Sequence, residues 1–240
     1  MPDRDSGKWL GYELGKEKFQ RPDGKEVVDD CKASYYAMVP EHSDNVWPKE
    51  VNLQTPFQVI GSLMDKTGRQ VMEKIGLTGD KAALALDTHQ VGRMLYYRPT
   101  ENPMWCGPHH DHGVFTTLLP AVYFTPDGKQ VAEPEEAGLF VKSANDADFR
   151  KVVSDDPEVM LFQVGEFGQL ATNDKIRATE HRVHGSNTLE RYTMALFFAA
   201  PFNSVHNSAS VLTKDARWGS GESCRYGDWH IRSMERYRAK

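Results

Sequence analysis

Three residues from two distant segments have the types and the spacing of a metal site. His109 and Asp111 stand two apart within the segment 107–113, and His181 lies far downstream in the segment 180–183. Side chains at positions i and i+2 of a β-strand point to the same face, so His109 and Asp111 can reach one ion. Two imidazoles and one carboxylate form the facial triad of non-haem Fe(II) centres, which leaves half of the octahedron open. We therefore predict an iron site from these three residues.

A second pair, Arg191 and Thr193, also shares one face of a predicted strand. The guanidinium of an arginine can grip a carboxylate with two hydrogen bonds, and a threonine hydroxyl adds one donor. The run 194–199 that follows is apolar, which places Arg191 at the mouth of a buried strand. A buried cation needs a partner, and a bound dicarboxylate would provide one. An ion pair with a carboxylate of the protein is the alternative that the residues leave open.

Other metal ligands are present nearby. His110, His112 and His184 could form a tetrahedral zinc site with a water molecule as the fourth ligand. That set leaves Arg191 and Thr193 without a role, so we favour the iron site. Cys106 is a candidate thiolate ligand, but soft sulfur suits zinc or copper better than iron of this kind.

Four segments of this chain, in the same order, resemble the isopenicillin N synthase-like branch of the Fe(II)/2-oxoglutarate oxygenases. Residues 93–99 resemble the branch's Asn-Tyr-Tyr-Pro strand, and residues 107–119 resemble Gly-x-His-x-Asp-x-Gly followed by a Leu-rich strand. Residues 164–183 resemble Gly-Asp…Thr-Asn-Gly…Lys-Ser-x-x-His-Arg-Val, and residues 191–198 resemble Arg-x-Ser-x-x-Phe-Phe. The chain departs from these patterns where Leu95 replaces Asn, His110 replaces Thr, Asp174 replaces Gly and Thr193 replaces Ser.

The resemblance implies roles for six residues. His109, Asp111 and His181 would bind iron, and Tyr97, Arg191 and Thr193 would hold the distal carboxylate of 2-oxoglutarate. From the residues alone, the adjacent tyrosines of the segment 93–99 read better as a pair of core side chains. Trp105, His110, Phe115, Tyr123 and Phe140 are candidates for lining the pocket, although packing explains the aromatic ones equally well.

The implied activity is that of a 2-oxoglutarate-dependent dioxygenase. Such an enzyme couples oxidative decarboxylation of 2-oxoglutarate to succinate with hydroxylation, or a related oxidation, of a small-molecule substrate. The cofactors expected are Fe(II), 2-oxoglutarate as cosubstrate and O₂, with ascorbate as a candidate reductant. Two alternatives remain open at this point: an isopenicillin N synthase-type oxidase that does not use 2-oxoglutarate, and a catalytically silent metal-binding module of the same fold.

The composition limits the partners that the protein is expected to bind and the cell compartment in which it is expected to act. The 240 residues carry a formal net charge of −5 and no cluster of Lys and Arg, which argues against nucleic acid or an anionic membrane as a partner. No apolar run is long enough to cross a bilayer. Cys31, Cys106 and Cys224 are odd in number and form no disulfide pattern, which favours the reducing cytoplasm.

The pattern along the chain predicts a mainly β fold with flanking helices and a double-stranded β-helix, or jelly-roll, core. We expect one structural domain with an irregular segment over 1–50, where the family's N-terminal region looks shortened, a helical segment over 51–90, the oxygenase core over 91–205 and a tail over 206–240. The helix should begin at Thr55-Pro56, end at Gly76 and bury an apolar stripe. That stripe comprises Phe57, Ile60, Met64, Val71, Met72 and Ile75. A shorter helix is expected over 81–86, strands at 91–97, 114–119, 121–124, 129–132, 138–142, 159–163, 168–172, 180–184 and 191–199, and a C-terminal helix with Ile231, Met234 and Tyr237 on one face.

Overall fold

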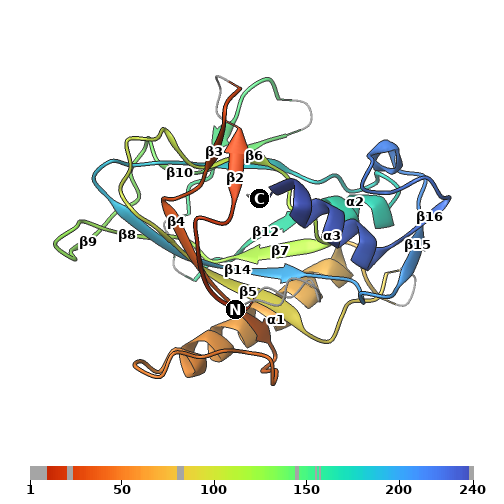
Figure 1. The fold of residues 1–240 in the computed structure, drawn as a ribbon, viewed down its shortest axis with the longest axis horizontal. Helices are drawn as coiled ribbons and strands as arrows, with labels where there is room; N and C mark the ends of the chain where they lie inside the picture. The colour runs from red at the N-terminus through yellow and green to blue at the C-terminus, as the bar shows by residue number, and fades with distance from the viewer. Residues whose placement is uncertain are drawn as a thin grey trace.

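The computed structural model describes residues 10–20, 24–79, 84–143, 146–154, 156 and 158–237. A large antiparallel sheet has the strand order β1-β4-β5-β14-β7-β12, and β8 extends it by pairing with β14 and β9. A smaller sheet has the order β11-β10-β13-β6. Together they form the jelly-roll core that the sequence predicted (Figure 1).

The bounds of the elements are as follows. The strands are β1 Gly11–Leu14, β2 Lys18–Gln20, β3 Glu26–Val28, β4 Lys32–Val39, β5 Gln90–Tyr97, β6 Met104–His109, β7 Phe115–Leu118, β8 Val122–Phe124, β9 Gln130–Val131, β10 Gly138–Lys142, β11 Arg150–Lys151, β12 Leu161–Val164, β13 Glu180–His184, β14 Glu190–Phe198, β15 Val205–Asn207 and β16 Ser223–Arg225. The helices are α1 Gln54–Lys74, α2 Glu166–Ala171 and α3 Tyr226–Tyr237, with a 3₁₀ turn η1 at Val211–Lys214.

The first fifty residues are more regular than the sequence indicated. Strand β4 pairs with β5 along its full length, from Lys32 opposite Tyr97 to Val39 opposite Gln90, and β1 pairs with β4 at the edge. Strands β2 and β3 form a separate hairpin. The expectation of an irregular segment was wrong here because prolines break only the ends of these strands, while the β-forming residues between them find partners in β5.

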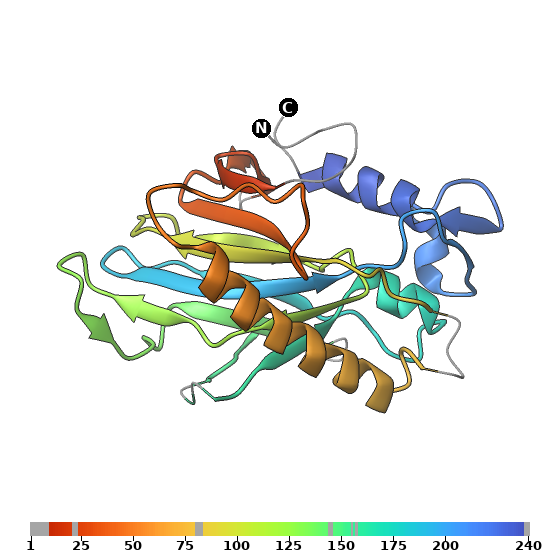
Figure 2. The same cartoon turned by 90° about the horizontal axis from the view of Figure 1, so that it is seen from below.

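Helix α1 crosses the outer face of the large sheet (Figure 2). Its buried residues are Phe57, Gly61, Met64, Gly68 and Met72. The predicted stripe is therefore wrong at Ile60 and Ile75, which are 38% and 42% exposed. Instead, Gly61 and Gly68 lie where the helix contacts the sheet. A Cβ at Gly61 would stand 2.6 Å from Val39, and a Cβ at Gly68 would collide with Phe198 and Thr117. The helix can approach the sheet closely only where it has no side chain.

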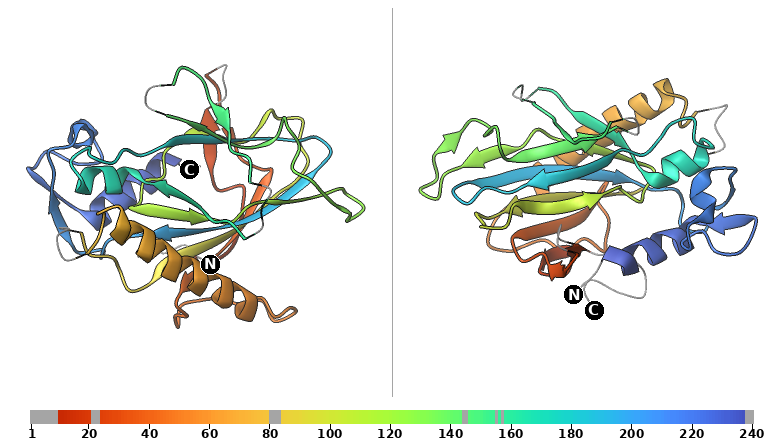
Figure 3. Two further views of the ribbon diagram at one scale, coloured as in Figure 1. Left: turned by 180° about the vertical axis from the view of Figure 1, so that it is seen from behind. Right: turned by 90° about the horizontal axis from the view of Figure 1, so that it is seen from above.

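Two segments differ from the predicted elements at the end of the molecule where β14 ends. Residues 166–171 form helix α2, whereas a strand was expected over 168–172. A short apolar run does not distinguish a strand from a buried helix. Helix α3 buries Tyr226, Trp229 and Ser233, whereas Ile231 of the expected face is 37% exposed. Figure 3 shows α2 and α3 gathered at this same end.

Three smaller findings complete the fold. Residues 125–128 turn the chain between β8 and β9, with Gly128 at φ +84°. The helix expected over 81–86 falls partly outside the described residues, and residues 84–86 have no regular structure. Of the helices in the described part of the chain, none has the length and apolar character needed to cross a membrane.

Candidate metal centre and cosubstrate pocket

The three predicted metal ligands converge at the mouth of the jelly roll. His109 is the last residue of β6, and it pairs with His181 near the start of β13. Asp111 Oδ1 lies 3.9 Å from His109 Nε2 and 3.8 Å from His181 Nε2, and the ligand atoms all lie within 4.8 Å of one another. Metal–ligand bonds of about 2.1 Å at right angles would separate the donor atoms by about 3 Å. The arrangement therefore fits one ion after a small contraction.

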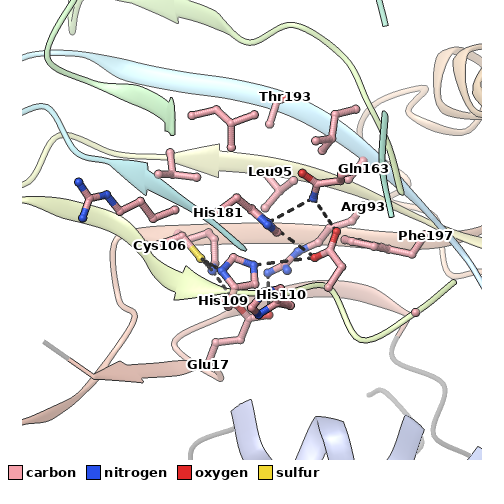
Figure 4. Close-up of a pocket in the computed structure, with 18 of the residues that line it drawn as sticks. Glu17, Arg93, Leu95, Cys106, His109, His110, Gln163, His181, Thr193 and Phe197 are labelled. Carbon is pink, nitrogen blue, oxygen red and sulfur yellow. Dashed lines mark hydrogen bonds and ion pairs between the residues drawn. The ribbon is translucent and has the colours of Figure 1, made fainter. Parts of the chain in front are cut away.

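Asp111 is not on the strand that carries His109. Strand β6 ends at His109, opposite His181 of β13, and the chain then crosses to β7 of the other sheet. The prediction that both ligands share one strand face is wrong in this detail. The loop 110–114 instead brings the carboxylate of Asp111 back beside the imidazoles. Figure 4 shows the rings of His109 and His181 next to each other in the cavity.

Both histidines are oriented by backbone carbonyls. His109 Nδ1 donates to the carbonyl of Gly107 at 2.8 Å, and His181 Nδ1 donates to that of Thr179 at 3.2 Å. This leaves His109 Nε2 for the ion, whereas His181 Nε2 lies 3.2 Å from Gln163 Nε2, a contact that a bound ion would replace. Burial, followed by the charge of His109, lowers the pKa of His181 to about 4, so this ring is neutral at pH 7. Burial also opposes charge on His109, but Cys106 and Asp111 raise its pKa to about 9. A metal ion must displace that proton when it binds.

The carboxylate of Asp111 is fixed by two residues that sequence reasoning missed. Its Oδ2 accepts hydrogen bonds from Thr116 Oγ1 at 2.6 Å and from Gln163 Nε2 at 2.7 Å, so Oδ1 faces the imidazoles. Thr116 and Gln163 are cross-strand partners in β7 and β12. Burial raises the pKa of Asp111, but the histidines and these two hydrogen bonds lower it below its ordinary value. A single polar residue in the apolar strand 161–164 is the signal that could have identified Gln163.

The competing ligands point elsewhere. His112 contacts His230, with 3.0 Å between their nitrogens, and His184 stacks on Phe140 with ring centroids 4.0 Å apart. Within the described residues, only His109, Asp111 and His181 form a group that could hold a metal ion. Cys106 Sγ lies 3.8 Å from His109 Nδ1, on the far side of the ring from the site. The alternative zinc set is therefore wrong.

Arg191 lies buried in the wall of the same cavity without a carboxylate partner. It is 6% exposed, its Nε donates to the hydroxyl of Tyr123 at 3.2 Å, and its guanidinium carbon lies 5.1 Å from the centre of the Tyr97 ring. Among the described residues no Asp or Glu oxygen lies within ion-pair distance of it. The structure therefore leaves a buried cation facing a cavity.

Thr193 and Tyr97 lie next to Arg191, and the structure gives the contacts that each of them makes. Register places Arg191 opposite Tyr97 and Thr193 opposite Leu95, and all four residues line the cavity. Thr193 Oγ1 donates to the carbonyl of Leu119 at 2.8 Å, so its proton is already engaged. Tyr97 is 4% exposed and offers its ring to the guanidinium.

Tyr123, which the sequence singled out as a pocket candidate, lies behind this wall and contacts two residues that line the cavity. Its hydroxyl accepts from Arg191 and donates to Glu133 Oε1 at 3.0 Å. Of the other pocket candidates, His110 lines the cavity, while Trp105 and Phe115 are buried and Phe140 stacks on His184.

The cavity has a volume of about 930 Å³ and extends past the metal ligands to a second, polar wall. There Glu17 accepts from Lys32 at 2.6 Å and from Arg93 at 2.8 Å, and Lys32 also contacts Asp29 at 2.9 Å. The cavity is thus large enough for two small molecules, one on each side of the triad.

Comparisons with known proteins agree with this geometry. Residues 88–200 match the family model of the 2OG-Fe(II) oxygenase superfamily. Gibberellin 2-beta-dioxygenase 5 of Oryza sativa subsp. japonica is 30% identical over 89 residues, which are 36% of this chain and 25% of that protein. The matched region thus spans a quarter of the length of that relative.

Solved structures show the same fold over nearly the whole chain. A full-length Neurospora crassa protein in complex with alpha-KG superimposes with a TM-score of 0.66 at 20% identity, covering 98% of this chain and 74% of that one. A 2OG-Fe(II) oxygenase family structure from Caulobacter crescentus gives a TM-score of 0.64 at 19% identity, covering 96% and 77%. At these identities the likeness establishes the architecture.

Proposed function

We propose, from the premise that this chain belongs to the 2OG-Fe(II) oxygenase superfamily, that it is an Fe(II)- and 2-oxoglutarate-dependent dioxygenase. It would couple oxidative decarboxylation of 2-oxoglutarate to succinate with hydroxylation, or a related oxidation, of a small molecule. This proposal rests on Arg191, which is buried in the cavity that the three candidate metal ligands share and has no carboxylate partner among the residues that the structure describes.

His109, Asp111 and His181 would hold Fe(II). The ion, when bound, supplies the O₂ chemistry and binds the cosubstrate at the positions that a facial triad leaves open. The chain's own part is orientation. The carbonyls of Gly107 and Thr179 hold the imidazoles, while Thr116 and Gln163 turn one oxygen of Asp111 toward them.

Arg191 would bind the distal carboxylate of 2-oxoglutarate. An unpaired buried cation is costly, and a bidentate carboxylate would neutralise it inside the cavity. Tyr97 would support the guanidinium from one side and Tyr123 from the other. Thr193 would add a hydrogen bond only by turning its hydroxyl away from the carbonyl of Leu119.

The prime substrate would enter the other half of the cavity, which Arg93 of β5 and Tyr36 of β4 line. A volume of this size suits a small organic molecule. Two similar structures were solved with bound small molecules, one with alpha-KG and thymine and the other with 2OG, Fe and JA.

We further propose that the chain belongs to the isopenicillin N synthase-like branch, because four motif segments occur in the same order. We also propose that it acts in the cytoplasm, because its three cysteines are free.

The test is anaerobic titration of the Fe(II)-loaded protein with 2-oxoglutarate, observed through the weak visible charge-transfer band of the chelate. We expect the band in the wild type, its loss in His181→Ala, and a much higher concentration requirement in Arg191→Met. Arg225→Gln, which removes an exposed arginine that does not line the cavity, should titrate as the wild type does. Bound iron without the band would favour an oxidase that does not use 2-oxoglutarate, and absence of bound iron would favour a silent module.

A further inference from the structure

Three consecutive carbonyl groups of the loop that carries Asp111 are held from outside the loop. The carbonyl of Asp111 accepts from the backbone N–H of Glu166 at 2.7 Å, and that of Gly113 accepts from Phe167 at 3.0 Å. Between them, the carbonyl of His112 accepts from Trp229 Nε1 at 2.8 Å. A ligand on a loop has no strand ladder to fix it, so these three bonds set where Asp111 lies.

The donors come from two helices that are distant in sequence. Glu166 and Phe167 belong to the first turn of α2, whose N–H groups have no partners inside the helix. Trp229 belongs to α3. Gly165 allows α2 to press on the loop, because a Cβ there would collide with the carbonyl of Gly113.

One side chain, Arg217, joins these two helices. Its Nη1 and Nη2 donate to the two oxygens of Glu166 at 2.5 and 2.8 Å, and its guanidinium carbon lies 4.3 Å from the centre of a Trp229 ring. Asp215 accepts two further bonds at 3.0 and 3.1 Å, and Ser233 of α3 lies 3.3 Å from Nη1. Glu166 and Arg217 are 6% and 4% exposed, so the pair is shielded from water.

We propose that Arg217 is a positioning residue for the metal site. It fixes Glu166 and Trp229 against each other, and through them it fixes the backbone of the loop that presents Asp111. This inference rests on the proposed function, since it assumes that Asp111 is a metal ligand. A tie that served stability alone would leave the metal affinity of the folded protein unchanged.

The experiment measures Mn(II) affinity by calorimetry and the visible spectrum of the Co(II)-loaded protein, on the full chain, at a temperature where circular dichroism shows each variant folded. Arg217→Lys keeps the charge but loses the bidentate contact and the stacking. Trp229→Phe keeps an aromatic ring at this position and removes the donor to the carbonyl of His112. Arg225→Gln is the matched control, because it breaks an ion pair to α3 that lies on the surface.

We expect both Arg217→Lys and Trp229→Phe to weaken Mn(II) binding by about 10-fold and to alter the Co(II) spectrum at saturation, with the control unchanged. Unchanged affinity and spectrum in the two variants, whatever happens to their melting temperatures, would overturn the proposal. If Arg217→Lys does not fold, Glu166→Gln, which removes the charge that Arg217 binds and keeps the shape of the side chain, is measured in its place. A wild type that binds neither metal would instead refute the proposed function, and this inference with it.

Discussion

Arg191 and Arg217 are both almost fully buried, yet their surroundings are opposite. Arg217 has two carboxylates, Glu166 and Asp215, and uses most of its donors on them. Arg191 has a tyrosine hydroxyl and an aromatic ring but no carboxylate among the described residues. A buried cation with its own counterions contributes to the architecture, whereas our proposal is that Arg191, which lacks one, binds an anion that arrives from solution.

The charged cluster around Arg93, at the polar wall of the cavity, resembles the surroundings of Arg217. There the arginine pairs with Glu17 and donates to Ser34 at 3.0 Å, while Glu17 also pairs with Lys32. Since each charge has a partner, this cluster resembles the surroundings of Arg217 more than those of Arg191. It joins the segment that precedes β2 to the inner face of β4 and β5.

The sharpest test of the difference replaces each arginine by methionine. Arg217→Met should lower the free energy of unfolding by about 3–5 kcal/mol, because it leaves the buried carboxylate of Glu166 without its cation. Urea denaturation at pH 7 measures this. The same replacement at exposed Arg225 should have no measurable effect. A stable Arg217→Met variant would contradict the view that this arginine is a structural tie.

Arg191→Met should show the reverse pattern. We expect the affinity for 2-oxoglutarate to fall by about 2–3 kcal/mol, the value of hydrogen bonds to a charged group, while the free energy of unfolding does not decrease. Calorimetry with the Mn(II)-loaded protein gives the first quantity and urea denaturation the second. Loss of stability comparable to that of Arg217→Met would mean that Arg191 has a structural partner after all.

A smaller effect should come from the hydroxyl that orients Arg191. Tyr123→Phe removes the acceptor for Arg191 Nε and keeps the ring, so 2-oxoglutarate binding should weaken by about 1 kcal/mol. Metal affinity should stay the same, because Tyr123 contacts none of the three metal ligands. The same titration that measures Arg191→Met also measures this variant, and equal loss of metal binding would argue for a general disturbance of the cavity.

The smallest expected effect concerns acid stability. Hydrogen bonds and charge from Arg217 outweigh burial and lower the pKa of Asp215 from its ordinary 3.8 to about 2. A depressed pKa in the folded state stabilises the fold above pH 4, and this contribution disappears as the pH falls toward 2. Asp215→Asn should therefore flatten the dependence of the unfolding free energy on pH in that window. Because Asp215 is partly exposed, the change should be small.

The sequence predicted those site residues that can be recognised from a short segment of the chain, and it missed those whose role depends on contacts between distant segments. His109 and Asp111 stand two residues apart, as do Arg191 and Thr193, and His181 lies in a short segment that matches a known pattern. The predicted strands at 180–184 and 191–199 agree with β13 and β14. Thr116 carries no such local signal, and Gln163 stands out only as the polar residue of an apolar strand. Their common contact with Asp111 forms only when β7 pairs with β12. Arg217 gave no signal at all, since nothing near it in sequence resembles a functional motif.

The sequence by itself determined the chemistry that this protein can perform: two imidazoles and a carboxylate of suitable types, a cation with an apolar strand behind it, and enough β-forming segments for a jelly roll. The tertiary structure decided which of these groups remain unpaired. Whether a buried arginine meets a carboxylate depends on contacts between residues such as 166 and 217, which are far apart in the chain. Side-chain periodicity gives the face on which a residue lies, whereas only the packing of sheets and helices gives its partner.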